Sequence, residues 1–303
     1  MAVPIIEISN EITRQYQVEL FIKREDLLHP LISGNKIRKL KYNILQANKE
    51  QKDTILTFGG AYSNHIFAVA AAGQEFGIKT VGIIRGESYQ SLNPTLQFAV
   101  DSGMHLHYFN REQYRQKYQP QTIENLKEHF GNFYLVPEGG SNRLALPGCA
   151  EIWHELEQDY DFLCTPVGTG GTLAGLITGN QSVTRLLGFP VLKGGEYLKK
   201  EIEKLLLESC KKPEMFRNQW QLITNYHLGG YARFNTELIH FINNFKSTFG
   251  IPLDPVYTGK MMYAIFDLIK NEFFQPGTKI LALHTGGLQG IAGFNQRFGD
   301  LIR

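Results

Sequence analysis

A basic stretch near the N-terminus, ISGNKIRKLKYNIL at residues 32–45, contains lysines that could act as nucleophiles. Its apolar residues repeat at the spacing of a helix and predict one buried stripe. Arg38 and Lys39 fall on the far side of this helix, and Lys41 falls at the edge of the stripe. We therefore expect these three side chains to lie in solvent or to reach it by their long stems.

Lys36 differs because it occupies the first turn of the predicted helix, directly after Gly34 and Asn35. The positive end of the helix dipole and partial burial both disfavour an ammonium there, so we expect a lowered lysine pKa. A neutral lysine amine adds to aldehydes and forms imines. Helical phase alone leaves both Lys36 and Lys41 open, and the place in the first turn favours Lys36.

A glycine-rich turn follows the apolar run that ends at Val167 and precedes a predicted helix. The residues of this turn are Gly168, Thr169, Gly170, Gly171 and Thr172. Glycines let the backbone approach a ligand, threonine hydroxyls donate hydrogen bonds, and a helix N-terminus offers free N–H groups. The turn therefore predicts a phosphate site, although a tight turn without a ligand would fit the glycines about equally well.

The kind of phosphate follows from what the turn lacks. A P-loop requires a lysine followed by Ser or Thr, and neither follows these glycines. A dinucleotide fingerprint requires a third glycine where this chain has Leu173, and a carboxylate about 20 residues further on. A P-loop nucleotide and a dinucleotide are therefore both weakened as ligands of this turn. The remaining candidate ligand is a small phosphate monoester.

A second turn, GGAYSNH, places Ser63, Asn64 and His65 at the start of a predicted helix over 64–76. This helix is apolar on nearly every side, so we expect it to be buried. Ser63 or Asn64 could simply cap it. Three polar residues in succession at a buried N-terminus favour binding of a carboxylate instead.

An imine-forming lysine, a phosphate turn and a carboxylate site together indicate pyridoxal 5′-phosphate acting on an amino acid. The same residues also carry a resemblance. In chain order, the motifs IKRED with SGNKIRKL, GGAYSNH, VGTGGTLAGL, LDPVYTGK and HTGG resemble the 1-aminocyclopropane-1-carboxylate (ACC) deaminase/D-cysteine desulfhydrase family of fold-type-II pyridoxal-phosphate enzymes. The likeness covers almost the whole chain.

The resemblance implies roles around the cofactor. Lys36 would form the Schiff base with the cofactor aldehyde, and the turn Gly168–Thr172 would hold the phosphate. Asn64 would reach the ring O3′, and Tyr257 would lie against the ring.

The resemblance also implies roles around the substrate. Ser63 would lie beside the reacting carbons, and the N–H groups of Asn64 and His65 would help to bind the carboxylate, together with the Asn64 side chain. A second tyrosine of the site would be Tyr231 or Tyr226, with a preference for Tyr231.

One departure from the family bears on the reaction. ACC deaminases have YEG where this chain has Tyr257-Thr258-Gly259, and the glutamate there faces the pyridine nitrogen of the cofactor. Thr258, or Thr285 of HTGG, offers only a neutral hydrogen bond, so the ring would be a weaker electron sink. His65 also points away from ACC deaminase, because the motif SNH resembles the desulfhydrase branch of the family, whereas SNQ resembles the deaminase branch.

The implied activity is deamination by β-elimination, with D-cysteine giving pyruvate, ammonia and sulfide. ACC deamination and a D-serine-type elimination stay as alternatives. A protein of another class, which binds a phosphorylated metabolite without chemistry, would also fit the glycine turns.

The elements that must position these residues alternate between apolar runs and helical stretches, which predicts an α/β fold with parallel sheets. The expected strands are 18–23, 54–58, 80–84, 105–109, 133–137, 162–167, 184–192, 220–224 and 279–285. The expected helices include 64–76, 91–102, 121–130, 143–158, 172–179, 195–209, 235–248 and 259–272, beside the lysine helix.

Domain organisation follows from the resemblance rather than from a linker. It implies two doubly wound domains with the active site in the cleft between them. Residues 1–47 and 141–303 would form the larger, cofactor-binding domain, and residues 48–140 a smaller α/β domain inserted in it. The resemblance also implies a homodimer.

Composition excludes several classes of protein. The 303 residues are 43% hydrophobic and 20% charged, which is average for a globular chain, and a formal charge of +2 gives no field for nucleic acid or an anionic membrane. The three widely spaced cysteines suggest reduced thiols and no zinc site. The N-terminus shows no export signal, so we expect a cytoplasmic protein.

Overall fold

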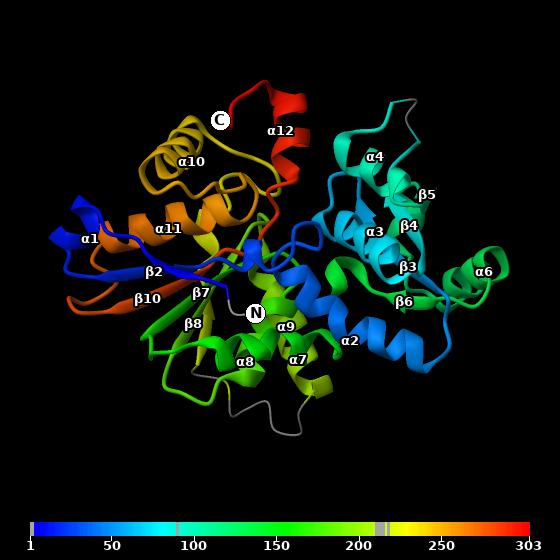
Figure 1. The fold of residues 1–303 in the computed structure, drawn as a ribbon, viewed down its shortest axis with the longest axis horizontal. Helices are drawn as coiled ribbons and strands as arrows, with labels where there is room; N and C mark the ends of the chain where they lie inside the picture. The colour runs from blue at the N-terminus through cyan, green and yellow to red at the C-terminus, as the bar shows by residue number, and fades with distance from the viewer. Residues whose placement is uncertain (1–2, 89–90, 210–215, 217–218) are drawn as a thin grey trace.

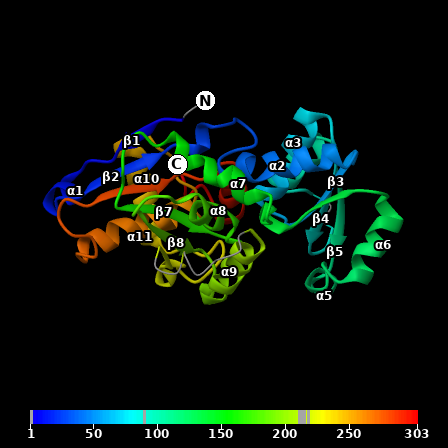
Figure 2. The same cartoon turned by 90° about the horizontal axis from the view of Figure 1, so that it is seen from below.

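The computed structural model describes residues 3–88, 91–209, 216 and 219–303, which form two lobes with one sheet each (Figure 1). Figure 2 shows the lobes from below, with α2 (Asn35–Lys49) and α7 (Ala145–Ala150) between them. The predicted α/β class with mainly parallel sheets is confirmed. Within the described ranges, no helix is long and apolar enough to span a bilayer.

The larger lobe is built on a six-stranded sheet. In sheet order its strands are β1 (Ile5–Glu7), β2 (Glu19–Lys23), β10 (Lys279–Leu283), β7 (Phe162–Val167), β8 (Arg185–Pro190) and β9 (Trp220–Leu222). The edge strand β1 pairs antiparallel with β2, and the other pairs are parallel.

Helices cover both faces of this sheet. One face packs on α1 (Glu11–Gln15), α10 (Thr236–Phe249), α11 (Thr258–Lys270) and α12 (Gly290–Phe298), and the other on α7, α8 (Gly171–Gly179) and α9 (Leu198–Ser209). Strands that are buried on both faces read as continuous apolar runs, which is why the sequence reveals them.

The smaller lobe has a four-stranded parallel sheet. In sheet order its strands are β5 (Met104–Phe109), β4 (Lys79–Arg85), β3 (Thr54–Gly60) and β6 (Tyr134–Val136). One face packs on α2, α3 (Asn64–Phe76) and α4 (Pro94–Asp101), and the other on α5 (Arg111–Arg115) and α6 (Pro120–Phe130). The buried helix predicted over 64–76 is α3, and its bounds are confirmed.

The carboxyl ends of the parallel strands lead into both predicted ligand turns. Strand β3 ends at Gly60, just before Ser63, and β7 ends at Val167, just before the glycine turn. Ligands of open α/β sheets bind outside the carboxyl ends of the strands. Both turns therefore stand where a ligand is expected.

Some elements differ from their prediction. The helix predicted over 143–158 is α7 followed by a 3-10 helix, Glu151–Glu155, and the helix over 195–209 begins as a 3-10 turn before α9. Apolar spacing does not separate an α-helix from a 3-10 helix that continues it. The short elements β1, α1 and α5 were not predicted, because they contain too few residues to show a clear period. Helix α12 was not predicted either.

The predicted solvent exposure of two basic residues on α2 is wrong. Arg38 is 4% exposed and Lys39 is 2% exposed, because α7 and α3 cover α2 on sides that helical phase assigns to solvent. Lys41 is half-exposed as expected, and its amine is 2.6 Å from a carboxylate oxygen of Glu151.

Each sheet takes its strands from one of the two sequence segments expected to form a domain. We retain the division into residues 1–47 with 141–303, and residues 48–140, as a proposal. Helix α2 crosses the first boundary and contributes Leu40 and Ile44 to the core of the smaller lobe. Cys149 and Cys164 are buried free thiols, and Cys210 lies outside the described residues.

Candidate active site

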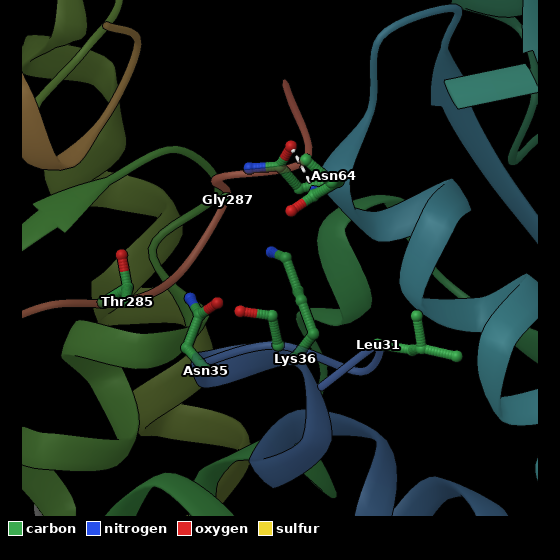
Figure 3. A pocket seen from close by; sticks show the side chains of 8 residues that line it. Leu31, Asn35, Lys36, Asn64, Thr285 and Gly287 are labelled. Carbon is green, nitrogen blue, oxygen red and sulfur yellow. Dashed lines mark hydrogen bonds between the residues drawn. The ribbon is translucent and has the colours of Figure 1, made fainter. Parts of the chain in front are cut away.

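Lys36 lies at the start of α2 and lines a pocket between the lobes. Figure 3 shows its amine pointing from α2 toward Asn64 and the segment from Thr285 to Gly287. The residues that line the pocket are Leu31, Ser33, Asn35, Lys36, Asn64, Thr285, Gly287 and Gln289. The two lobes and the start of α2 therefore all contribute to one site.

Gly34 allows α2 to begin against the end of β10. Its φ of 62° is in the left-handed region, and a Cβ added to it would lie 1.9 Å from the carbonyl oxygen of Thr285. The N–H of Asn35 donates to the same carbonyl at 3.4 Å. The glycine of GNK is thus required for the approach that brings Lys36 beside Thr285.

The environment of Lys36 favours a neutral amine. Burial lowers the pKa of Lys36 well below its usual value, and the charge of Lys39 lowers it further. The expected depressed pKa is therefore present, and desolvation is its main cause. A neutral amine can attack an aldehyde or accept a proton.

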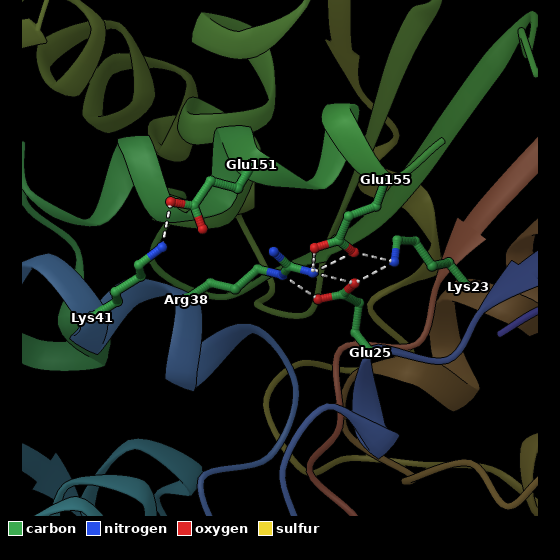
Figure 4. Close-up of polar contacts among 6 residues, drawn as sticks. All are labelled: Lys23, Glu25, Arg38, Lys41, Glu151 and Glu155. Carbon is green, nitrogen blue, oxygen red and sulfur yellow. Dashed lines mark hydrogen bonds and ion pairs between the residues drawn. The ribbon is translucent and has the colours of Figure 1, made fainter. Parts of the chain in front are cut away.

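Buried ion pairs hold α2 in place close to Lys36 (Figure 4). The guanidinium of Arg38 contacts Glu25 at 2.5 Å and Glu155 at 2.8 Å. The amine of Lys23 contacts the same two carboxylates, at 3.0 and 2.7 Å. Burial opposes the charge of Glu155, but hydrogen bonds from Lys23 and Arg38 outweigh it and hold its pKa below the usual value. These contacts join α2 to β2 and to the 3-10 helix after α7.

Lys39 is a site residue that the sequence reasoning missed. Its amine donates to the carbonyl of Gly139 at 3.0 Å and to Oγ of Ser141 at 2.9 Å. It also lies 3.1 Å from the position that a Cβ of Gly171 would take, so it adjoins the glycine turn. Burial lowers the pKa of Lys39 to about 8. Its spacing of three residues from Lys36, which puts both on neighbouring positions of one helix face, was the signal available in the sequence.

The glycine turn has the geometry of an anion site. Helix α8 begins at Gly171, and Gly170, with φ 82°, has no side chain to cap the first N–H groups. The side chain of Asn35 donates to Oγ1 of Thr172 at 2.7 Å, which ties the turn to the residue next to Lys36. Oγ1 of Thr169 lies 2.5 Å from Oγ of Ser141, the hydroxyl that Lys39 also contacts. The turn and the two lysines therefore belong to one site.

The start of α3 is capped by Ser63. Its Oγ accepts hydrogen bonds from the N–H groups of His65 at 3.2 Å and Ile66 at 3.3 Å. Capping thus occupies the His65 N–H that was expected to bind a carboxylate. The hydroxyl proton of Ser63 stays available, because both bonds use its oxygen as the acceptor.

The next two side chains point to different surroundings. Oδ1 of Asn64 accepts from Nε2 of Gln289 at 2.8 Å, in the pocket that contains Lys36. The ring of His65 is buried, and its Nε2 lies 2.8 Å from Oγ1 of Thr57. Burial lowers the pKa of His65 well below its usual value, so the ring is neutral. The His65 side chain does not line this pocket.

The open choice between two tyrosines is narrowed by their contacts. The rings of Tyr231 and Tyr257 lie 6.1 Å apart, and a Cβ on Gly168 would lie 3.2 Å from the Tyr257 ring. Tyr226 instead donates its hydroxyl to Asp267 at 2.7 Å and packs on the core of the larger lobe. Burial raises the pKa of both Tyr231 and Tyr257, so both phenols keep their protons at neutral pH.

Two threonines were candidates to meet the pyridine nitrogen, and their hydroxyls differ. Oγ1 of Thr258 donates to Oδ1 of Asp254 at 2.7 Å and accepts from its N–H at 3.0 Å, in a fully buried position. Thr285 lines the pocket, and its hydroxyl makes no hydrogen bond with any described residue. Thr285 is therefore the threonine with a free hydroxyl.

These residues fit pyridoxal phosphate. The aldehyde requires a neutral amine, which the lowered pKa of Lys36 provides. The phosphate requires N–H donors and positive charge, and the uncapped start of α8 and Lys39 provide both. The glycine turn admits no Cβ at Gly171, where it would lie 2.4 Å from Oγ of Ser141. The described residues contain no cluster of His, Cys, Asp or Glu that could hold a metal ion.

The chain is similar to known proteins in sequence and in fold. The family model of the pyridoxal-phosphate dependent enzymes matches residues 3–286. A putative ACC deaminase of Pyrococcus horikoshii is 30% identical over 307 residues, covering 96% of this chain and 91% of the relative. The mitochondrial bifunctional D-cysteine desulfhydrase/ACC deaminase of Arabidopsis thaliana is 30% identical, over 90% of this chain and 73% of its own.

A crystal structure of an ACC deaminase homologue matches the whole fold, with a TM-score of 0.85 and 29% identity over 100% of this chain and 94% of the other. The match includes both lobes, so the likeness is not confined to the cofactor motifs. The chain belongs to the family of pyridoxal-phosphate dependent enzymes of fold type II, with pyridoxal 5′-phosphate as its cofactor, and within it to the enzymes that resemble ACC deaminases.

Proposed function

We propose that this enzyme deaminates a small amino acid by β-elimination and that D-cysteine is its best substrate, giving pyruvate, ammonia and sulfide. The observation that carries the proposal is the absence of a free carboxylate or hydroxyl at residue 258. Thr258 is neutral and its hydroxyl is already bonded to Asp254. The name of the Arabidopsis relative, which includes D-cysteine desulfhydrase, supports this substrate class.

The bound cofactor supplies an aldehyde that binds the substrate amine and a ring that accepts electrons from Cα. The free hydroxyl of Thr285 is the described group best placed to meet the ring nitrogen. A hydroxyl does not hold that nitrogen protonated as a carboxylate would, so electron withdrawal is moderate. Loss of a thiolate needs less withdrawal than opening of a cyclopropane, which favours D-cysteine over ACC.

Lys36 is the proposed base for the Cα proton. Its depressed pKa keeps its amine neutral and able to accept a proton, whereas the phenols of Tyr231 and Tyr257 have raised pKa values and are poor bases. The same tyrosines are suited to donate a proton to a leaving group. Ser63 can donate its hydroxyl proton while its oxygen accepts from the backbone of α3.

The substrate carboxylate has donors at the start of α3. Asn64 offers its side-chain Nδ2, since its Oδ1 is occupied by Gln289. The N–H of His65 is used by the Ser63 cap, so we assign the carboxylate chiefly to Asn64 and the hydroxyl of Ser63. Substrate binding by these groups holds the Cα–H bond toward Lys36.

ACC deamination is the second candidate, because both relatives described above carry that activity in their names. A D-serine-type elimination differs from the proposed reaction only in its leaving group. A non-catalytic binding protein is not retained, because the chain belongs to a family of enzymes. Dimerisation and a cytoplasmic location stay predictions.

The test compares substrates on the protein loaded with pyridoxal phosphate. D-Cysteine, L-cysteine, D-serine and ACC are supplied at equal concentration, and sulfide, ammonia and 2-oxo acid are measured. We expect D-cysteine to have the highest kcat/KM, with sulfide and pyruvate in equal amounts. A higher kcat/KM for ACC, or no sulfide from D-cysteine, would overturn the proposal. The Lys36→Ala variant, treated in the same way, measures the background reaction that does not depend on Lys36.

A further inference from the structure

We propose that Gln289 is a positioning residue, which fixes the Asn64 side-chain amide so that its Nδ2 donates to the carboxylate of the bound amino acid. The inference rests on the proposed function, because it assumes that an amino acid binds beside Lys36. It adds a residue that neither motif nor spacing singled out. Gln289 belongs to the turn between β10 and α12.

A direct hydrogen bond joins the two amides across the lobes. Nε2 of Gln289 donates to Oδ1 of Asn64 at 2.8 Å, although 225 residues separate them in the chain. Both side chains line the pocket that contains Lys36 and Thr285. Figure 3 shows the Asn64 side chain across this pocket from Lys36. The contact is therefore part of the site rather than of a remote surface.

The turn that carries Gln289 is fitted closely around Asn64. The N–H of Gly290 donates to the carbonyl of Gly287 at 3.0 Å, which closes the turn. A Cβ on Gly287, whose φ is 94°, would lie 2.6 Å from Nδ2 of Asn64, and one on Gly290 would lie 3.5 Å from its Oδ1. Glycine at 287 thus lets the turn approach the amide, and Gln289 meets its oxygen.

The segment after the turn is also held against the smaller lobe. Helix α12 contacts α4, and a Cβ on Gly293 would lie 2.9 Å from the ring of Tyr62. Strand β10 holds the other end of the segment in the larger sheet. Gln289 is therefore presented to Asn64 by a segment that is anchored on both sides.

The orientation of the Asn64 amide has a chemical consequence. An amide presents one donor end and one acceptor end, and only the donor end can bind a carboxylate. Because Gln289 donates to Oδ1, Nδ2 is the end left for a ligand. This matters more here because Ser63 already uses the N–H of His65. Loss of the orientation would weaken carboxylate binding without touching Lys36.

The experiment compares Gln289→Met and Gln289→Glu in the protein loaded with pyridoxal phosphate. Methionine has a similar length and makes no such hydrogen bond. Glutamate has nearly the same shape but can only accept, so it would draw Nδ2 of Asn64 to itself and turn Oδ1 toward the ligand.

The probes are D-alanine, which has no leaving group, and ethylamine, which has no carboxylate. Binding of each is followed by the change in the visible absorption of the cofactor, and the midpoint of thermal unfolding is measured alongside. We expect D-alanine binding to weaken about 3- to 10-fold in Gln289→Met and by more than about 10-fold in Gln289→Glu. Ethylamine binding should stay within about 2-fold of wild type in both.

A purely structural role predicts that binding of D-alanine and of ethylamine weakens equally in Gln289→Met, because loss of packing does not depend on the carboxylate of the ligand. The inference is overturned if Gln289→Glu binds D-alanine at least as well as Gln289→Met, or if D-alanine and ethylamine weaken equally. If wild-type protein binds neither probe, the proposed function fails, and this outcome is distinguished from the others by the wild-type titration alone.

Discussion

Three basic side chains of the site, Lys36, Lys39 and His65, lie close enough for their charges to interact, and none forms an ion pair within the described residues. Burial lowers all three pKa values, to about 8 for Lys39. Such a cluster is short of negative charge. A bound phosphate would supply that charge, so binding of the cofactor and protonation of Lys39 should be linked.

This linkage predicts how cofactor affinity changes with pH. Without phosphate the pKa of Lys39 is about 8, and a phosphate dianion beside the amine raises it, so binding takes up a proton at alkaline pH. We expect affinity for pyridoxal phosphate to fall as the pH rises above about 8, by up to about tenfold per pH unit. Fluorescence titration of the cofactor-free protein between pH 7 and 10 measures it.

The Lys39→Met variant should bind pyridoxal phosphate about 10- to 100-fold more weakly at pH 7.5 and lose this pH dependence. Lys41→Met is the matched control, because Lys41 is half-exposed and paired with Glu151. Pyridoxal, which lacks the phosphate, should bind the wild type and Lys39→Met alike. An equal loss of pyridoxal binding would contradict the assignment.

A second prediction separates the two threonines. Thr285→Val should lower kcat for D-cysteine elimination about 10-fold with little change in stability, since its hydroxyl has no partner among the described residues. Thr258→Val should instead reduce stability by about 1–3 kcal/mol, because it removes one of four donors to the buried Asp254 carboxylate and leaves the Asp254 N–H without its acceptor. Steady-state kinetics and urea unfolding of both variants are the measurements. The reverse pattern would assign the ring nitrogen to Thr258.

Sequence reasoning reached Lys36 but not Lys39, and the reason is physical. The place of Lys36 in the first turn after a glycine is local information. The burial of Lys39 depends on α7 and on the turn at Gly139, about 100 residues away. The argument from helical periodicity assumes that one side of a helix is buried and the other faces solvent. Other elements cover both sides of α2.

At the scale of elements, the ion pairs of Arg38 with Glu25 and Glu155 hold α2 against the larger lobe. Arg38→Met would leave the carboxylate of Glu25, which is 1% exposed, with one cationic partner fewer. We expect a loss of about 3 kcal/mol in the free energy of unfolding, as for other broken buried pairs. Lys41→Met removes an exposed pair on the same helix and should cost less than about 1 kcal/mol.

Urea unfolding followed by circular dichroism distinguishes these outcomes. Equal small losses for Arg38→Met and Lys41→Met would mean that the buried network does not hold α2.

The parallel strands and long helices could be predicted because apolar runs mark elements buried on both faces. Short elements such as β1 and α5 could not, since tertiary contacts rather than periodicity specify them.

At the scale of the whole molecule, two close approaches bring the C-terminal segment to the pocket: Gly34 against Thr285, and Gln289 against Asn64. Such contacts join residues more than 200 positions apart, and no local pattern encodes them. The motifs could be placed in one site only through the family resemblance. The hydrogen bond between Gln289 and Asn64 could be found only in the structure.

The first approach can be tested with glycine variants. In Gly34→Ala the new Cβ would meet the Thr285 carbonyl at 1.9 Å, so α2 must shift and Lys36 with it. We expect a loss of stability above about 3 kcal/mol and loss of the visible cofactor band. Gly77→Ala is the matched control, because Gly77 has a similar φ of 66° with no atom within 4 Å, and should cost about 1 kcal/mol. Similar losses in the two variants would show that backbone strain alone is responsible.

The central claim is that Lys36, and no other buried lysine, carries the cofactor. Borohydride reduction of the protein loaded with pyridoxal phosphate, followed by peptide mass spectrometry, tests it directly. The structure predicts one pyridoxyl adduct on Lys36 and none on Lys39 or Lys260, whose amines are held by hydrogen bonds to backbone carbonyls. An adduct on another lysine, or no adduct at all, would contradict the account.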